Sequence, residues 1–279
     1  MRPPRSSRLA ALGRGLSIAL ALAFTSHGAQ AVPILGVSQA RSLTASASAA
    51  IAGSTDSDSD AVSAPDFGLF DESIAPDALV QLAASGQTAS ATGTASQVSS
   101  LGSNSVTSSG SARAQLGLAP GTNGSAEASA SSVFEFVFDI AATSDFALTG
   151  TLDTQALLAG GAGLPTIVND LLFENLTTAT TLFQALSDDE AFAVSGLLLP
   201  GTYRLTASAS VNGTQTSTFT SGRSVDARST YAFTLDVATV AVPEPGSLGL
   251  ALTALAMMAG GHKRAAPSGR RGRAPSKAA

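Results

Sequence analysis

A period-two alternation of residue types runs through much of the chain and constrains its fold more than any other feature. Val37–Ser54 alternates small apolar with polar residues, and the same composition returns at Thr88–Ser100, Ala126–Ser132 and Thr206–Val211. Successive side chains of an extended strand point to opposite faces, so this pattern predicts strands with one buried face. The uneven spacing leaves two explanations open, a repeat architecture and a simple bias toward small residues.

Larger apolar residues follow the same alternation in the second half of the chain. In Ser132–Ile140 the residues Phe134, Phe136 and Phe138 share one face, and Ser229–Val237 repeats the pattern. Further strands are expected at Phe146–Asp153, Thr166–Phe173, Thr180–Leu186, Ala191–Leu199, Thr202–Val211 and Thr214–Thr220. Many short strands with Gly and Pro turns predict an all-β body, a β-sandwich or jelly roll.

Three segments predict local departures from this strand series. Ile74–Ala84 has Pro76 near its start and Gly86 after its end, which predicts one short helix. Ser99–Gly124 is rich in Ser, Gly and Asn and predicts a loop with weak strands. Asn212-Gly213 predicts a hairpin turn, because both residues tolerate positive φ.

The first 31 residues have the organisation of a secretory signal peptide. Arg2, Arg5, Arg8 and Arg14 precede an apolar run at Gly15–Phe24, and Ala29-Gln30-Ala31 supplies small residues at a cleavage site. This predicts a signal helix, export, and cleavage after Ala31.

The C-terminal region combines three elements with a physical meaning. Val242-Pro243-Glu244-Pro245 ends the folded body, because its prolines fit neither a strand nor a helix interior. The uncharged run 246–261 predicts a short transmembrane helix, although a full span needs about 20 apolar residues. Lys263 and Arg264 follow at once and would stay on the cytoplasmic side.

This order resembles the PEP-CTERM sorting signal of exported bacterial proteins. Pro243, Glu244 and Pro245 match its motif, Leu248–Ala259 its span, and Lys263 with Arg264 its basic stop. The resemblance covers residues 242–264 and implies an exosortase-type processing enzyme that cleaves near the motif. It also implies a role in the extracellular matrix, because the PEP-CTERM family is associated with bacteria that make exopolysaccharide. The basic tail 265–279 is an addition to the pattern and is expected to be disordered.

Between these ends lies an acidic body, which we divide into an N-terminal part (32–125) and a sandwich part (126–241). Of the 15 Lys and Arg residues ten lie in the two ends, whereas 19 of the 20 acidic residues lie in 32–241. Five basic residues against 19 acidic ones give the body a net charge of −14. Such a charge argues against a nucleic-acid partner.

The composition of the body argues against catalysis. His27 and His262 are the two histidines, cysteine is absent, and both lysines lie in the tail. The body therefore lacks the usual bases, thiolate nucleophiles and zinc ligands, which leaves only carboxylate chemistry. Asp188-Asp189-Glu190 is the densest acidic cluster, on an expected exposed turn.

Asp56, Asp58 and Asp60 are the candidate metal ligands. Alternating carboxylates resemble the start of a calcium loop, but Ala61 and Phe67 stand where that loop needs Gly and Glu. We therefore expect a solvated acidic loop, with these three residues as the ligands if calcium binds.

Two functions remain. The first is a non-catalytic protein that is exported, held in the membrane by its C-terminal segment, and then sorted to the cell envelope, surface or extracellular matrix. Its partners would be the export machinery, the processing enzyme and extracellular polysaccharide. The alternative is a calcium- or carbohydrate-binding module at the cell surface.

Overall fold

A computed structural model describes residues 34–186, 190–217, 220–240 and 255, and within them the chain forms thirteen strands in two antiparallel sheets. Sheet A has the order β10 (Thr180–Leu186), β9 (Thr166–Asn175), β12 (Gly201–Ser217), β7 (Gly124–Ile140), β1 (Leu35–Ile51), β2 (Ser54–Ser63). Sheet B has the order β11 (Glu190–Leu198), β8 (Ser144–Ala159), β13 (Arg223–Thr239), β6 (Ser105–Leu118), β5 (Gln87–Leu101), β3 (Phe70–Ile74), and β4 (Asp77–Leu82) also pairs with β5.

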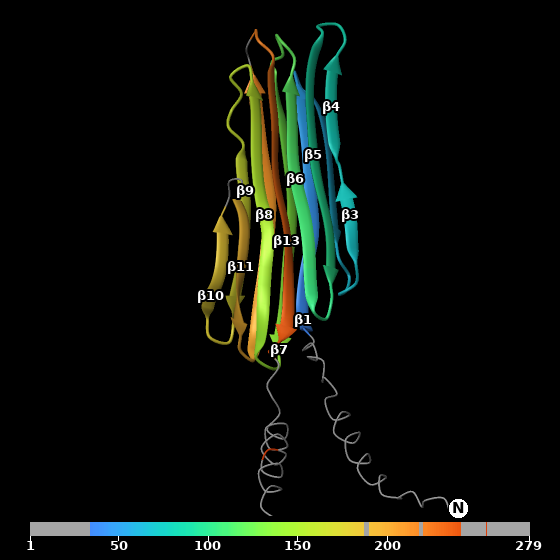
Figure 1. Ribbon diagram of the computed structural model, residues 1–279. Coiled ribbons are helices and arrows are strands. Elements are labelled where there is room, and N and C mark those ends of the chain that lie inside the picture. Colours follow the sequence, from blue (N-terminus) through green and yellow to red (C-terminus); the bar gives the residue numbers. More distant parts are fainter. Residues whose placement is uncertain (1–33, 187–189, 218–219, 241–254, 256–279) are drawn as a thin grey trace, which may run out of the picture. The chain divides into compact units, whose positions relative to one another are not determined.

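The two sheets lie face to face with the core between them (Figure 1). Alternate residues of the long strands are buried, and Phe134, Phe136 and Phe138 share the inner face as predicted. The prediction of an all-β fold is confirmed. The expected signal helix and membrane helix lie outside the described residues.

Both parts of the body contribute to both sheets. β1 and β2 extend sheet A from β7, and β5 and β6 extend sheet B from β13. The described residues up to Val240 belong to one compact unit. The core is therefore continuous across residue 125.

The first and last described strands meet at one end of the sandwich, which we call the basal end. The amide of Ile34 donates to the carbonyl of Ser103 at 2.6 Å, and the amide of Val237 donates to that of Asn104 at 2.8 Å. Both bonds reach the turn between β5 and β6, so β1 begins where β13 ends (Figure 1). The opposite end is the distal end.

The core changes in composition along the strands. Toward the basal end it is aromatic, and rings from the two sheets interlock, as in Phe134 with Phe233 at 5.1 Å and Phe146 with Phe173 at 5.4 Å between centroids. Toward the distal end β1, β5, β6, β7 and β12 present mostly alanines, among them Ala47, Ala91, Ala114, Ala128 and Ala209. Small inner residues let the sheets approach closely there.

Gly93 on β5 lies at a close approach between the two sheets. A Cβ atom at this position would lie 2.5 Å from the carbonyl oxygen of Ser129 and 2.7 Å from that of Ser46. Both oxygens belong to the backbone of sheet A, where Ser46 and Ser129 are paired between β1 and β7. Only glycine fits this position without separating the sheets.

Arg41 on β1 is a fully buried cation near the basal end. Its Nη1 donates to the carbonyl of Gly68 at 2.8 Å and to Ser99 Oγ at 3.1 Å, and its Nη2 donates to the carbonyl of Asp66. Its guanidinium also lies over the ring of Phe70, 5.6 Å from the centroid. Burial lowers the pKa of Arg41, although the charge of Asp66 acts the other way. Arg41 thus holds the segment that crosses from β2 in sheet A to β3 in sheet B.

The predicted helix at Ile74–Ala84 is wrong. The segment contains the end of β3 and the whole of β4, which pairs with β5 so that Ala78 lies opposite Ala91 and Val80 opposite Ala89. Ala78 and Val80 are buried, whereas Leu79 is exposed. Pairing with β5 selects the period-two face of a segment whose apolar residues also fit a helical period.

The prediction of a loop with weak strands at Ser99–Gly124 is right only in part, because one long strand, β6, occupies Ser105–Leu118 between β5 and β13. Its small inner residues, including Gly110 and Ala112, look loop-like in sequence but suit the narrow distal and central core.

The predicted hairpin at Asn212-Gly213 is also wrong. β12 continues through both residues, with Asn212 opposite Ser129 and Gly213 opposite Ala128. A Cβ at Gly213 would lie 3.0 Å from Leu116 Cδ1 of sheet B. This glycine therefore serves the close packing of the sheets rather than a turn.

Candidate functional site

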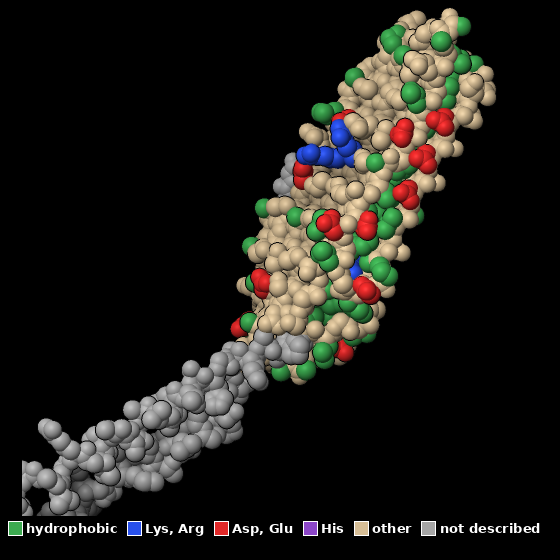
Figure 2. All heavy atoms as spheres, turned by 90° about the vertical axis from the view of Figure 1, so that its right-hand side faces the viewer, with side chains coloured by type: hydrophobic (Ala, Val, Ile, Leu, Met, Phe, Trp, Pro, Cys, Tyr) green, Lys and Arg blue, Asp and Glu red, His purple; other side chains and the backbone are tan. Residues whose placement is uncertain are grey.

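One lateral edge of the sandwich carries a concentration of carboxylates, which we call the acidic edge. It lies where β2 of sheet A faces β3 and β4 of sheet B, and acidic side chains follow it along the molecule (Figure 2). Its members are Asp56, Asp58 and Asp60 on β2, Asp66 in the following segment, Asp71 and Glu72 on β3, and Asp77 on β4.

The three candidate calcium ligands lie on a strand and not on the predicted loop. β2 pairs with β1 so that Asp56 lies opposite Ala49, Asp58 opposite Ala47 and Asp60 opposite Ala45. Directly opposite residues share a face, and these alanines are buried. The carboxylates therefore point toward the inner side of sheet A, at the margin where the sandwich opens to solvent.

This position gives Asp56 a contact across the margin. Its Oδ2 accepts a hydrogen bond of 2.9 Å from the backbone amide of Leu79 on β4. Charged side chains that point inward from an edge strand prevent another chain from adding to it. The acidic edge thus protects the exposed margins of both sheets.

The strand also separates the three carboxylates. Residues at i and i+2 of a strand are about 6.7 Å apart, so Asp56 and Asp60 are about 13 Å apart at Cα. Asp58 and Asp60 each accept a hydrogen bond from the next backbone amide, at 2.8 and 2.7 Å. Among the described residues, no three His, Cys, Asp or Glu side chains form a group that could hold a metal ion. Asp56, Asp58 and Asp60 are therefore arranged to attract cations diffusely along β2 rather than to coordinate one ion together.

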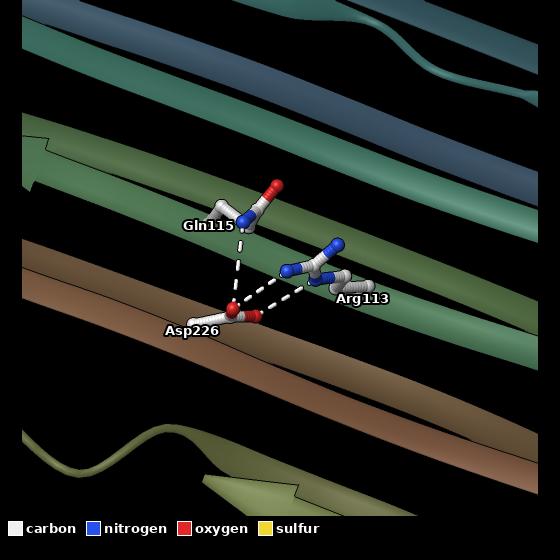
Figure 3. Close-up of polar contacts among 3 residues, drawn as sticks. All are labelled: Arg113, Gln115 and Asp226. Carbon is white, nitrogen blue, oxygen red and sulfur yellow. Dashed lines mark hydrogen bonds and ion pairs between the residues drawn. The ribbon is translucent and has the colours of Figure 1, made fainter. Parts of the chain in front are cut away.

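The exposed arginines pair with carboxylates outside the acidic edge. Arg113 on β6 makes two hydrogen bonds to Asp226 on β13, at 2.8 and 2.6 Å, and Gln115 Nε2 donates to the same carboxylate at 3.4 Å (Figure 3). The bonds from Arg113 lower the pKa of Asp226 most strongly. Arg204 pairs with Glu174, and Arg228 with Asp153. None of these three ion pairs involves a carboxylate of the acidic edge.

Two hollows on the described surface differ in their lining, and the one on sheet A is lined by serines together with Asp58 and Glu127. The hollow on the outer face of sheet B is lined by hydroxyl and small side chains, such as Thr107, Thr149, Gly150, Thr151 and Thr234, without a titratable residue. His27, His262, Asp188 and Asp189 lie outside the described residues. The expectation that the protein is not an enzyme stays a prediction.

Aromatic residues are largely in the core. Burial raises the pKa of Tyr231 to about 12, and Tyr203 is 1% exposed. Tyr203 lies on β12 inside sheet A, where its hydroxyl donates to the carbonyl of Leu199 at 2.6 Å. Phe67 is the exposed aromatic residue of the described part. A flat aromatic platform for sugar rings is therefore not formed by these side chains.

The sorting residues lie outside the described part of the chain. They are Ala29 and Ala31 at the expected cleavage site, Val242, Pro243, Glu244 and Pro245 in the motif, and Lys263 and Arg264 in the basic stop. Among the residues whose structure is described, none belongs to a helix with the length and apolar character of a membrane span.

Sequence reasoning missed the far end of β8. The strand was expected to end at Asp153, but it continues to Ala159 and exposes Leu157 and Leu158. The signal was the run Ala156-Leu-Leu-Ala159, which has no polar residue on either face.

Comparison with known proteins adds no assignment: no protein family, no curated protein and no solved structure matches the chain.

Proposed function

We propose that the protein is an exported, non-catalytic component of the bacterial cell surface or extracellular matrix. In this proposal residues 1–31 direct export, and the C-terminal segment holds the body in the membrane. An exosortase-type enzyme then processes the chain near Pro243–Pro245, as the resemblance to PEP-CTERM signals implies. The acidic sandwich is the cargo.

The arrangement of the two ends is the observation that carries this proposal. Ile34 and Val237 both bond to the β5–β6 turn, so the described chain enters and leaves the sandwich at its basal end. In this proposal the basal end is the end through which the sandwich is attached. Its strands of up to 17 residues span roughly 55 Å.

The surface chemistry suits a hydrated matrix. Both outer faces carry ladders of hydroxyls, such as Ser46 with Ser129 at 2.8 Å and Ser96 with Ser111 at 2.7 Å. A net charge of −14 in residues 32–241 keeps the bodies soluble and apart from nucleic acid. Extracellular polysaccharide is the partner that these faces would meet.

Mass spectrometry of the mature protein tests the sorting mechanism. We expect an N-terminus at Val32 and a C-terminus near Val242–Pro245, and we expect Glu244→Ala to retain the full C-terminal segment in the membrane fraction. An intact Ala279 in a soluble fraction of wild-type cells would contradict the proposal.

The second candidate is a calcium- or carbohydrate-binding module, which the carboxylate row on the acidic edge favours. A specific calcium site with a Kd of about 0.1–1 mM, saturated tenfold or more, would raise Tm by several degrees. Because the row is spread along β2, we expect millimolar calcium to shift Tm by less than about 2 °C in a thermal scan. The matched control is magnesium at equal ionic strength, and a large shift for calcium alone that Asp58→Asn abolishes would favour the second candidate.

A further inference from the structure

The two ends of the sandwich differ in the large apolar side chains that they expose. The described distal loops 52–53, 83–86, 119–123 and 160–165 expose one such side chain, that of Leu164. At the basal end several such side chains are exposed in loops or at the start of a strand, and we call them the basal rim. They are Leu35 and Val37 at the start of β1, Phe67 and Leu69 between β2 and β3, Leu176 after β9, and Leu199 before β12.

Three members of the basal rim lie together where β1 begins. The register between β1 and β7 shifts between Gly36 and Ser38, so Val37 is the extra residue of a β-bulge. A bulge re-aims a side chain, and Leu35 and Val37 are both exposed. A Cβ atom at Gly36 would lie 2.8 Å from Cε1 of Phe67, so the ring of Phe67 lies against the backbone between these two residues.

The loop that carries Phe67 and Leu69 is fixed by hydrogen bonds. Arg41 donates to the carbonyls of Asp66 and Gly68, on either side of Phe67. The amide of Gly68 also donates to Asp66 Oδ1 at 2.8 Å. Leu69 is nevertheless 72% exposed. The fixed backbone therefore presents these apolar side chains to the surroundings instead of folding them into the core.

The other members of the basal rim are fixed beside the start of β12. The amide of Leu176 donates to the carbonyl of Thr202 at 2.9 Å, and the amide of Thr202 donates to Thr177 Oγ1 at 2.9 Å. The carbonyl of Leu199 accepts the hydroxyl of Tyr203 at 2.6 Å, and Leu199 is 61% exposed. Apolar side chains are thus held outward on both sides of the basal end.

The length of the chain sets how far this end can lie from a membrane. The described chain leaves the basal end at Val240, whose amide donates to the carbonyl of Thr143 at 3.3 Å. The uncharged run begins six residues later, at Gly246. Six residues reach about 20 Å when fully extended. With that run in the membrane, as in the proposed function on which this inference rests, the basal end lies within this distance of the lipid.

Charge selects the kind of lipid surface that the basal rim fits. All members of the rim are uncharged, and carboxylates lie beside them, with Asp66 next to Phe67 and Asp139 opposite Leu35. The guanidinium of Arg41 is buried. Anionic headgroups would be repelled by these carboxylates, so a neutral lipid surface is the better match.

We propose that the basal rim rests on the lipid bilayer while the C-terminal segment is held in it. The apolar side chains enter the boundary between headgroups and acyl chains, which such residues penetrate by about 5–10 Å. The run 246–261 is shorter than the about 20 apolar residues of a full span, and the rim supplies a second contact. Because the two are on one chain, each raises the effective concentration of the other at the lipid. The contact keeps Val242–Pro245 at the membrane surface.

Tryptophan fluorescence tests the contact, because the chain contains no tryptophan. The probe is the chain Val32–Ala279 in phosphatidylcholine vesicles whose acyl chains are brominated near the headgroup. We expect the emission of Leu199→Trp to be quenched at least about twofold, as for a side chain in the lipid boundary. The matched control is Leu164→Trp in a distal loop, where the residue is 86% exposed and we expect no quenching.

A charge in the basal rim tests whether its two sides act together. Leu69→Glu should remove at least about half of the quenching of Leu199→Trp, because a carboxylate resists transfer out of water. Leu164→Glu adds the same charge at the distal end and should leave the quenching unchanged. Anionic phosphatidylglycerol in the vesicles should weaken the quenching. Equal effects of the two glutamates, or stronger quenching in anionic lipid, overturn the proposal.

Flotation of the same chain with the vesicles separates this inference from the proposed function. A chain that does not float with them is not held by its C-terminal segment, which overturns both. A chain that floats, but with equal quenching at Leu199→Trp and Leu164→Trp, overturns the rim contact and leaves the proposed function in place. Blue-shifted emission of Leu199→Trp that brominated lipid does not quench means that protein covers the rim, such as a second copy, and also overturns the contact.

Discussion

Replacement of Gly93 by alanine should lower the free energy of unfolding by about 3 kcal/mol, near the upper end of the usual range for overpacking. The added methyl would lie 2.5 Å from the carbonyl oxygen of Ser129 and 2.7 Å from that of Ser46. Both are backbone atoms inside paired strands, so relief requires the sheets to move apart. That movement would loosen the alanine contacts of the distal core, where each side chain buries little surface. Chemical denaturation followed by circular dichroism measures the change.

Gly117→Ala is the matched control, because Gly117 lies on the neighbouring strand β6 and its Cβ would meet only Ser90 Oγ, at 2.8 Å. A hydroxyl on the outer face can rotate away, so we expect a change within about 0.5 kcal/mol. Similar effects of the two substitutions would show that the distal sheets are not held at the spacing described.

Replacement of Arg41 by methionine should also destabilise the fold by about 3 kcal/mol, because buried acceptors lose their donor. The carbonyls of Asp66 and Gly68 and the hydroxyl of Ser99 all accept hydrogen bonds from this guanidinium. The segment between β2 and β3 would lose its attachment to the core. We expect faster hydrogen exchange and earlier proteolysis there, in addition to a lower denaturation midpoint.

Arg113→Met is the control for Arg41→Met, since it removes an arginine of equal size from an exposed ion pair. The Arg113 and Asp226 side chains are 45% and 35% exposed (Figure 3), and such pairs contribute about 1 kcal/mol or less. Arg41→Lys should recover only part of the stability, because one ammonium cannot reach acceptors arranged for a planar fork. Equal stability of the Arg41→Met and wild-type chains would exclude the role given to Arg41.

The central strands were predictable from the sequence, because each has a neighbour on both sides and one face in the core. Under those conditions the alternation of Phe134, Phe136 and Phe138 fits only a strand that buries these three side chains. The same holds for Tyr231 and Phe233. The acidic character of the body was equally predictable, since charge depends on composition alone.

The margins were not predictable, because their structure depends on which strand lies beside them. The sequence pattern of Asp56–Asp60 predicts a loop, but pairing with β1 makes this segment a strand. The pattern of Ile74–Ala84 predicts a helix, but pairing with β5 makes most of it strand. Gly213 looks like a turn until sheet B packs against it. In the first two cases pairing with the adjacent strand of a hairpin overrides a local preference worth no more than about 1 kcal/mol per residue, and at Gly213 a contact with Leu116, far away in the sequence, does so.

By itself, then, the sequence determined that this is an anionic chain built from strands, with export and sorting signals predicted at its ends, because periodicity and charge are local properties. The tertiary structure alone decided which sheet margins are protected by charged side chains and which are uncovered. It placed the carboxylates of β2 on one edge and left Leu157 uncovered on the other, because the order of strands in a sheet is set by contacts between residues far apart in the chain.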